Sequence, residues 1–386
     1  MKRSTIVLLV VIAVLVIFGG TWLFRSPAPT GLSTIDSGPG PVPTVAVAAN
    51  VPMTGVLSYY GNAIREGATM AVDELAKKPG HLQLAVDWQD NGSDAKNAVT
   101  IMQQQYLRPI DIYVSGVKPQ AMAIKDAISA KGTPHFIFTF DVYVNHNSSN
   151  NLRTWPNYKL EAPVYLEYAR ARGAHRVAIV YVQLPHTSEE FNTLVIPGLE
   201  KLGITDVYAE PFELGKKDFK DVATKVRAFK PDLIILNGFQ ADLVGMIRAA
   251  RPLGLIHDGN TICTYDLLDA AKVLGPDELE GLRLVAPVFD TRPERELIRL
   301  WRERFQARYD KAPDYTHAYA YDMVTILNDA GSRLTLPATA EQWITALRAT
   351  QTEGVTGPLS FDEDGSLVTP VELGLYHDGK LAPTQP

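Results

Sequence analysis

The chain has 386 residues, enough for two domains of ordinary size, and carries a formal net charge of -6 without any basic block. This charge pattern argues against a nucleic-acid partner. Cys263 is the single cysteine, which excludes an internal disulfide and a cysteine-cluster metal site.

The N-terminal segment has the pattern of a membrane-directed helix. After the basic start "MKRS", residues 5–24 contain no charged side chain, and the next charge is Arg25. Twenty helical residues span about 30 Å, which matches the hydrocarbon core of a bilayer. Residues 1–25 are therefore expected to be an uncleaved anchor or a cleaved signal segment, with the basic end in the cytoplasm and the rest exported. The expected location is the bacterial periplasm or cell exterior, with the protein tethered to the cytoplasmic membrane.

Residues 26–44 are rich in proline, glycine and serine and predict an extended tether. From Val45 onward, short apolar runs alternate with segments of helical periodicity. The expected strands are 45–52, 82–90, 110–117 and 134–140. The expected helices between them are 60–77, 95–107 and 119–131. This alternation predicts βαβ units and a parallel sheet with both faces covered.

The same pattern then repeats, which predicts two α/β lobes of similar, doubly wound topology. Expected strands of the second half are 177–184, 206–214, 231–239 and 260–268. Expected helices of this half are 188–203, 216–229 and 241–254. The remainder holds one strand at 282–289, long helices at 294–309 and 317–334, and strands with turns within 357–381. We expect it to complete both lobes, with lobe 1 formed by 45–150 plus 265–333 and lobe 2 by 151–264 plus 334–386.

Motifs of common enzyme classes are missing from the sequence. It contains no G-x-S-x-G, no H-E-x-x-H and no P-loop pattern, and its eight histidines have no metal-ligand spacing. We therefore expect neither an enzyme nor a bound cofactor or metal.

Four segments follow one another along the chain: "MTGVLSYYGNAIREGATMAVDEL" (53–75), "RTWPNY" (153–158), "KAPDYTHAYAYDMVTIL" (311–327) and "GVTGPLSFDEDGS" (354–366). Together they resemble the periplasmic binding proteins of the leucine/isoleucine/valine type. The resemblance implies two lobes joined by three crossing segments, with a small-molecule ligand held in the cleft between them when they close. In sheets of this kind the cleft lies at the carboxyl ends of the strands.

The resemblance gives candidate ligand contacts at the strand ends of the first half, which are Tyr60, Val117, Lys118, Thr139 and Asp141. Relatives place small hydroxyl residues near 117–118 and at 141 to hold a ligand carboxylate. A lysine at a helix N-terminus opposes the helix dipole unless it meets an anion, and an aspartate would repel a carboxylate. A Lys118–Asp141 pair would explain both departures, although the lysine could also extend into water. Asp141 in particular favours a ligand with an ammonium, amide or hydroxyl group.

In the second half the resemblance gives as candidates His186, Phe239, Gln240, Tyr265 and Asp266. Relatives often have a tyrosine at the place of His186, and an acid that meets the ligand ammonium near 265–266. Two alternatives stay open, namely an exposed loop position for His186 and an N-cap role for Asp266.

These features predict the substrate-binding component of an ABC importer, which captures a small polar solute and delivers it to a membrane permease. The solute would be an amino acid, an amide or a related compound. The alternative is a ligand-sensing module that signals to a membrane or cytoplasmic partner.

Overall fold

The computed structural model describes residues 44–145, 148–257 and 259–385. The expected membrane segment and nearly all of the expected tether lie outside these residues. Within the described part of the chain, no helix is both long and apolar enough to cross a bilayer.

The first sheet is entirely parallel. Its strands are β1 (Thr44–Val51), β2 (Gln83–Asp90), β3 (Ile112–Gly116), β4 (His135–Phe138) and β5 (Asn151–Arg153). They are arranged in the order β2-β1-β3-β4-β5. Because side chains alternate along a strand, Val45, Val47 and Ala49 enter the main core on one face, and Ala48 enters a smaller core on the other. Both faces of the sheet are thus covered, as predicted.

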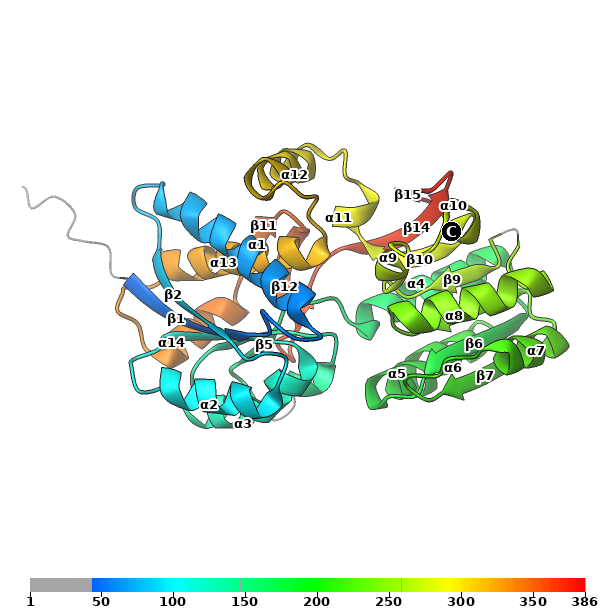
Figure 1. The fold of residues 1–386 in the computed structure, drawn as a ribbon, viewed down its shortest axis with the longest axis horizontal. Coiled ribbons are helices and arrows are strands. Elements are labelled where there is room, and N and C mark those ends of the chain that lie inside the picture. Colours follow the sequence, from blue (N-terminus) through cyan, green and yellow to red (C-terminus); the bar gives the residue numbers. More distant parts are fainter. Residues whose placement is uncertain (1–43, 146–147, 258, 386) are drawn as a thin grey trace, which may run out of the picture. The chain divides into compact units, whose positions relative to one another are not determined.

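Helices connect these strands, and later segments of the chain return to the same sheet. The connecting helices are α1 (Ser58–Ala76), α2 (Ala95–Gln105) and α3 (Lys118–Ala130). The returning helices are α12 (Glu296–Tyr309), α13 (Tyr315–Ser332) and α14 (Ala340–Arg348), followed by a small antiparallel sheet of β11 (Gln351–Gly354), β12 (Gly357–Phe361) and β13 (Leu367–Val368). Helices α1 and α13 lie side by side on one face of the sheet (Figure 1). We call residues 44–155 together with 289–368 the first lobe.

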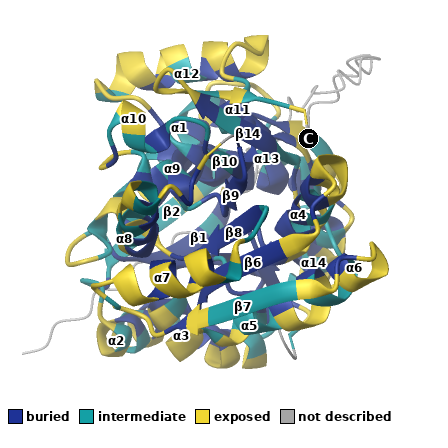
Figure 2. Ribbon diagram, turned by 90° about the vertical axis from the view of Figure 1, so that its right-hand side faces the viewer, coloured by how far each residue is buried: buried dark blue, intermediate teal, exposed yellow. Residues whose placement is uncertain are grey.

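The second sheet has a parallel body and an antiparallel edge. Its strands are β6 (Arg176–Val182), β7 (Asp206–Phe212), β8 (Leu233–Asn237), β9 (Thr261–Cys263), β10 (Arg283–Pro287), β14 (Val371–His377) and β15 (Lys380–Pro383). Their order is β15-β14-β10-β9-β8-β6-β7, and β14 runs antiparallel to both of its neighbours. Strands β6 and β8 are buried, whereas the edge strand β7 is mostly half-buried (Figure 2). The sheet is therefore enclosed at its centre, like the first one.

Helices on both faces complete this second lobe, which comprises residues 157–287 together with 371–385. They are α4 (Tyr158–Arg172), α5 (Pro185–Glu189), α6 (Ile196–Lys201), α7 (Lys220–Phe229), α8 (Gln240–Ala250), α9 (Leu267–Ala270) and α10 (Pro276–Leu279). The short helix α11 (Val288–Thr291) follows at the point where the chain returns to the first lobe. A π-helical turn at Glu190–Val195 joins α5 to α6. Alternate residues of β6 again enter separate cores on the two faces, with Val180 on one side and Ile179 on the other.

The repeat expected from the sequence is confirmed by the strand order. In the second sheet, β7-β6-β8-β9-β10 reproduces the order β2-β1-β3-β4-β5 of the first. The chain passes between the lobes after β5, after β10 and after β13, which gives the three expected crossing segments. The fold is thus two similar doubly wound α/β lobes.

The lobe boundaries differ from the expected ones. Strand β5 belongs to the first sheet and β10 to the second, whereas 151–264 had been assigned to lobe 2 and 265–333 to lobe 1. Trp343 and Leu359, expected in lobe 2, lie in the first-lobe core together with Val45. The apolar pattern of a strand indicates that it is buried but not which sheet it joins, so the sequence could not locate these crossings.

Candidate functional site

A small, partly open cavity lies where the two lobes meet, at the carboxyl ends of the strands. Its volume is about 30 Å³, which is room for about two water molecules. Phe140, which follows β4, is the first-lobe residue in its lining. The second-lobe residues of the lining are Asn157, Tyr158, Glu161, Val182, His186, Thr187, Glu190, Asn237, Gly238, Phe239, Thr264, Tyr265 and Asp266. The second lobe therefore supplies most of the chemistry of the site.

Helix α3 places Lys118 beside Asp141 at the cleft edge of the first lobe. The helix begins at Lys118 with Pro119 in its first turn, where the missing N–H of proline is not needed. Lys118 forms an ion pair with Asp141, whose carboxylate is 2 % exposed and also accepts a hydrogen bond from the Tyr143 N–H at 2.8 Å. The lysine is thus held by an anion of its own lobe rather than released into water.

The other first-lobe candidates support this pair or face away from the cavity. Thr139 is buried and its hydroxyl accepts a hydrogen bond from the Asp141 N–H at 3.2 Å. Val117 is buried in the first-lobe core. The Tyr60 hydroxyl reaches across the lobe interface and donates to Oδ2 of Asp269 at 3.4 Å. None of these residues lines the cavity.

His186 meets the first lobe from the opposite side. Because α5 begins at Pro185, the histidine sits in a helical turn and is half-buried, not exposed in a loop. Its Nδ1 lies 3.9 Å from Oδ2 of Asp141. Burial lowers the pKa of His186 more than the Asp141 carboxylate raises it, and the Lys118 ammonium lowers it further. His186 is therefore held neutral at the cavity wall.

The remaining second-lobe candidates divide into lining and supporting residues. Phe239, Tyr265 and Asp266 line the cavity. Gln240 is exposed and its amide donates to the Asp269 carbonyl at 2.8 Å, outside the cavity. Asp266 occupies the N-cap position of α9, but its side chain makes no capping hydrogen bond. The capping role that had been an alternative for Asp266 is therefore not observed.

Two buried glutamates in the lining were not anticipated. Glu161, in the first turn of α4, accepts hydrogen bonds at Oε1 from the Thr264 hydroxyl (2.8 Å) and the Tyr265 N–H (3.2 Å), and at Oε2 from the Tyr165 hydroxyl (3.3 Å). Glu190 accepts at Oε2 from the Asn237 amide at 3.4 Å, and its Oε1 has no hydrogen-bond partner. A glutamate in a helix ordinarily indicates a solvated face, so the sequence offered no signal for either residue.

Burial governs the protonation of these carboxyl groups. It raises the pKa of Glu161 to about 7 despite the three hydrogen bonds that oppose the change. It raises the pKa of Glu190 well above the ordinary value, with a further contribution from Glu161. Burial also raises the pKa of Asp266, to which Asp269 and Glu161 add. The cavity wall therefore holds protons that a suitable ligand could displace.

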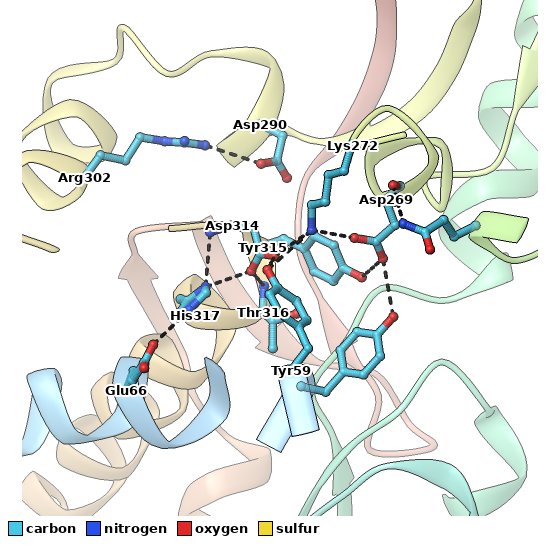
Figure 3. A network of polar contacts seen from close by, with 12 residues as sticks. Tyr59, Glu66, Asp269, Lys272, Asp290, Arg302, Asp314, Tyr315, Thr316 and His317 are labelled. Carbon is cyan, nitrogen blue, oxygen red and sulfur yellow. Dashed lines mark hydrogen bonds and ion pairs between the residues drawn. The ribbon is translucent and has the colours of Figure 1, made fainter. Parts of the chain in front are cut away.

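Beside the cavity, a polar network connects the two lobes (Figure 3). The Lys272 ammonium lies 2.7 Å from Oδ1 of Asp269 in its own lobe and 3.4 Å from Oδ2 of Asp314 in the first lobe. It also lies 4.7 Å from the ring centre of Tyr59, whose hydroxyl donates to Asp314. The Tyr315 hydroxyl, from the first lobe, donates to Oδ2 of Asp269 at 3.4 Å. These contacts hold the lobes together around the site.

A potential metal-binding group is found away from this site. In the described ranges, Glu280, His377 and Asp378 bring three ligand atoms close together on the surface. His377 is already within 2.7 Å of Glu280, and two of the three residues are exposed. The group lies outside the cavity lining and shares no residue with it.

Comparisons with known proteins identify the family. The model of the periplasmic binding protein family matches residues 44–380, so the chain belongs to this family. The leucine-, isoleucine-, valine-, threonine- and alanine-binding protein of Pseudomonas aeruginosa is 24 % identical over 333 residues, which cover 84 % of this chain and 87 % of that protein. The Leu/Ile/Val-binding protein of Escherichia coli strain K12 is 23 % identical over 332 residues, covering 84 % and 88 %.

Solved structures share the fold at lower identity. A leucine-binding protein from Thermotoga maritima has a TM-score of 0.73 and 21 % identity, and the match covers 88 % of this chain and 98 % of that one. A solute-binding protein of an ABC transporter from R. palustris, in complex with benzoate, has a TM-score of 0.72 and 16 % identity, covering 88 % and 95 %. The relatives are binding proteins, in agreement with the expectation that this chain is not an enzyme.

Proposed function

From membership of the periplasmic binding protein family, we propose that this chain is the extracytoplasmic solute-binding component of an ABC importer. It would capture a small polar solute between its lobes and present it to a membrane permease. The relatives named for leucine, isoleucine and valine support an amino acid or a chemically related compound as the solute.

The observation that carries this proposal is a polar, buried cavity lined from both lobes. Phe140 approaches from the first lobe, and Tyr265 and Asp266 approach from the second. Ligand pockets of binding proteins hold about 300–1,000 Å³, far more than the cavity volume of about 30 Å³. Capture therefore requires the lobes to separate, admit the solute and close again around the three crossing segments.

We propose the same mode of membrane attachment that the sequence indicates. Residues 5–24 would anchor the protein in the cytoplasmic membrane, with 26–44 as the tether to the folded part. The mature protein should then begin at Met1 or Lys2 when its N-terminus is sequenced. A mature N-terminus after residue 25 would instead identify a cleaved signal segment.

A thermal-shift screen tests the binding function. Amino acids, amides and aromatic acids should be tested separately against the purified full-length protein. A true ligand at 100 times its dissociation constant stabilises the folded state by about 2.7 kcal/mol, which raises the melting temperature measurably. If no small solute of any charge shifts the melting temperature or binds in a calorimeter, the proposed function is wrong.

A further inference from the structure

The ionisable groups of the cavity lining are mainly carboxyl groups. Glu161, Glu190 and Asp266 contribute carboxyl groups, and no lysine or arginine is among the lining residues. His186 also lines the cavity, and burial holds its imidazole neutral. A ligand that enters this cavity therefore meets carboxyl groups and no protein cation in direct contact.

One carboxyl oxygen of the lining, Oε1 of Glu190, lacks a hydrogen-bond partner among the described residues. Glu190 is 1 % exposed and its Oε1 accepts no hydrogen bond. Asp266 also lines the cavity; its carboxyl group forms no ion pair within the described ranges, and a hydrogen bond from its own main-chain N–H opposes the rise of its pKa. An unsatisfied buried carboxyl oxygen costs about 1–3 kcal/mol or more, so natural proteins rarely leave one without a role. Glu161, by contrast, accepts three hydrogen bonds, and both of its carboxyl oxygens have partners.

The charged groups around the cavity are already engaged elsewhere. Lys118 is paired with Asp141, and Lys272 lies between Asp269 and Asp314. Arg153 is fully buried, and its guanidinium donates to the main-chain carbonyls of Thr139 and Pro156, both at 3.2 Å, and of Trp155. Among the described residues, no ion pair joins these cations to Glu190 or Asp266, so an ionised carboxylate at either position would take its cation from the ligand.

Aromatic rings complete the lining. Phe140, Tyr158, Phe239 and Tyr265 all border the cavity, and the Phe140 and Tyr265 ring centres lie 5.0 Å apart. The face of an aromatic ring attracts a cation, and the attraction is stronger in a site from which water is excluded. Rings combined with several carboxyl groups, one of which has an oxygen without a partner among the described residues, are surroundings that suit an ammonium, amidinium or guanidinium group.

We propose that the solute captured by this site is a cation, whose charged group takes Glu190 and Asp266 as hydrogen-bond acceptors and contacts the surrounding rings. This inference rests on the proposed solute-binding function and narrows it. It goes beyond the ammonium contact that the resemblance implies near 265–266, because Glu190 adds a second carboxyl group to the cavity and the solute would carry a net positive charge. Arginine, agmatine, lysine and putrescine represent this class.

The competing ligand is an anion. Because burial raises the pKa of Glu190 and Asp266, protonated carboxyl groups could donate hydrogen bonds to a carboxylate. The two cases differ in the direction of proton exchange. A bound cation favours the ionised carboxylates and releases protons to the buffer, whereas a bound anion requires the carboxyl groups to keep or gain protons.

Titration calorimetry with the full-length protein decides between them. The cationic probes are arginine, agmatine, lysine and putrescine, and the comparison probes are leucine, valine, glutamate and benzoate. We expect at least one cation to bind 100-fold or more tightly than every comparison probe, with net proton release when buffers of different ionisation enthalpy are compared. Agmatine carries the guanidinium without a carboxylate, so its binding would show that the cationic group itself is recognised.

The outcomes separate this inference from the proposed function. Tight binding of leucine, glutamate or benzoate with no binding of the cations would overturn the inference and leave the solute-binding function intact. Absence of binding by all eight probes, together with a negative thermal-shift screen, would overturn both.

Single-residue variants assign the effect to the cavity. Glu190→Gln and Asp266→Asn should each weaken binding of the cationic probe at least 10-fold. Glu200→Gln is the matched control, because it removes the same charge from an exposed position of the following helix α6, outside the cavity lining. Circular dichroism and melting curves establish that each variant is folded, and the two cavity variants serve as alternatives to each other. Binding by folded Glu190→Gln or Asp266→Asn that equals binding by Glu200→Gln would contradict the proposal.

Discussion

The first lobe meets the cleft with one lysine and one aspartate that pair with each other, whereas the second lobe meets it with three carboxyl groups and no lysine or arginine in the lining. The two lobes have the same strand order, and Asp141 after β4 and Asp266 after β9 follow equivalent strand ends. The difference therefore lies in how the charges are satisfied. Charges paired within a lobe contribute to its structure, and charges without partners are those that a ligand can use.

The largest effect should come from breaking the first-lobe pair. Lys118→Met leaves the Asp141 carboxylate, which is 2 % exposed, without its cation. Removing one member of a fully buried pair costs about 3–5 kcal/mol, and the 41 % exposure of the lysine side chain reduces the expected loss to about 2–3 kcal/mol. Urea unfolding measures this free energy directly.

Lys159→Met is the matched control for that experiment. Lys159 is 42 % exposed, almost the same as Lys118, but it pairs with Asp364, which is itself 59 % exposed. We expect a loss below about 1 kcal/mol for this variant. Equal small losses in the two variants would show that Asp141 does not depend on its lysine, and the contrast between the two lobes would then fail.

The second-lobe wall should respond in the opposite direction. Burial raises the pKa of Glu161 to about 7, so the folded chain keeps a proton that the unfolded chain releases as the pH rises above about 4.5. The stability contributed by this group is present at low pH and is lost between about pH 4.5 and 7. Glu161→Gln removes the titration while its Oε1 can still accept from Thr264 and Tyr265. We expect a gain of about 2 kcal/mol at pH 8 and little change at pH 5.

Denaturant unfolding at the two pH values tests this prediction. Glu167→Gln on the same helix is the control, because Glu167 is exposed and its pKa is lowered by Arg170 rather than raised. This control should show no gain at pH 8. A Glu161→Gln variant that is destabilised equally at both pH values would mean that the carboxylate is needed in its ionised form, and the wall would not be a reservoir of protons.

The fold was largely predictable because its main signal is local. In β1 and β6, consecutive apolar residues enter cores on both faces, which is the pattern that a central parallel strand imposes on its sequence. The sheet that β10 joins depends on its pairing with β9 and β14, which are distant in sequence. That information is not contained in the strand itself, and the lobe boundaries were wrong for this reason.

The sequence predicted the Lys118–Asp141 pair but not the whole cavity lining, since Phe140, the first-lobe residue of the lining, was not among the candidates. The Lys118–Asp141 pair was expected because a lysine at a helix N-terminus opposes the helix dipole and an aspartate would repel a ligand carboxylate. Glu161 and Glu190 fit their local sequence, because a glutamate is common on the exposed side of a helix. Only the packing of the helices brings both side chains to the cavity wall. A buried carboxyl group on a helix can be recognised from its surroundings but not from its neighbours in sequence.

The smallest predicted effect concerns the contact between the lobes. Lys272→Met removes a cation that lies between Asp269 of the second lobe and Asp314 of the first. Lys311→Met is the matched control, since both lysines are close to half exposed and Lys311 pairs with Glu66 inside the first lobe. Each substitution should lower the free energy of unfolding by less than about 1 kcal/mol.

Only Lys272→Met should shift the ligand-free protein toward the arrangement with separated lobes, because it removes a contact that favours the closed arrangement. Small-angle X-ray scattering should then give a larger radius of gyration, and the ligand should bind about 2–5-fold more weakly. If the two variants scatter and bind alike, the lobes are held by their apolar and aromatic contacts, and the paired charges around Lys272 stabilise each lobe separately.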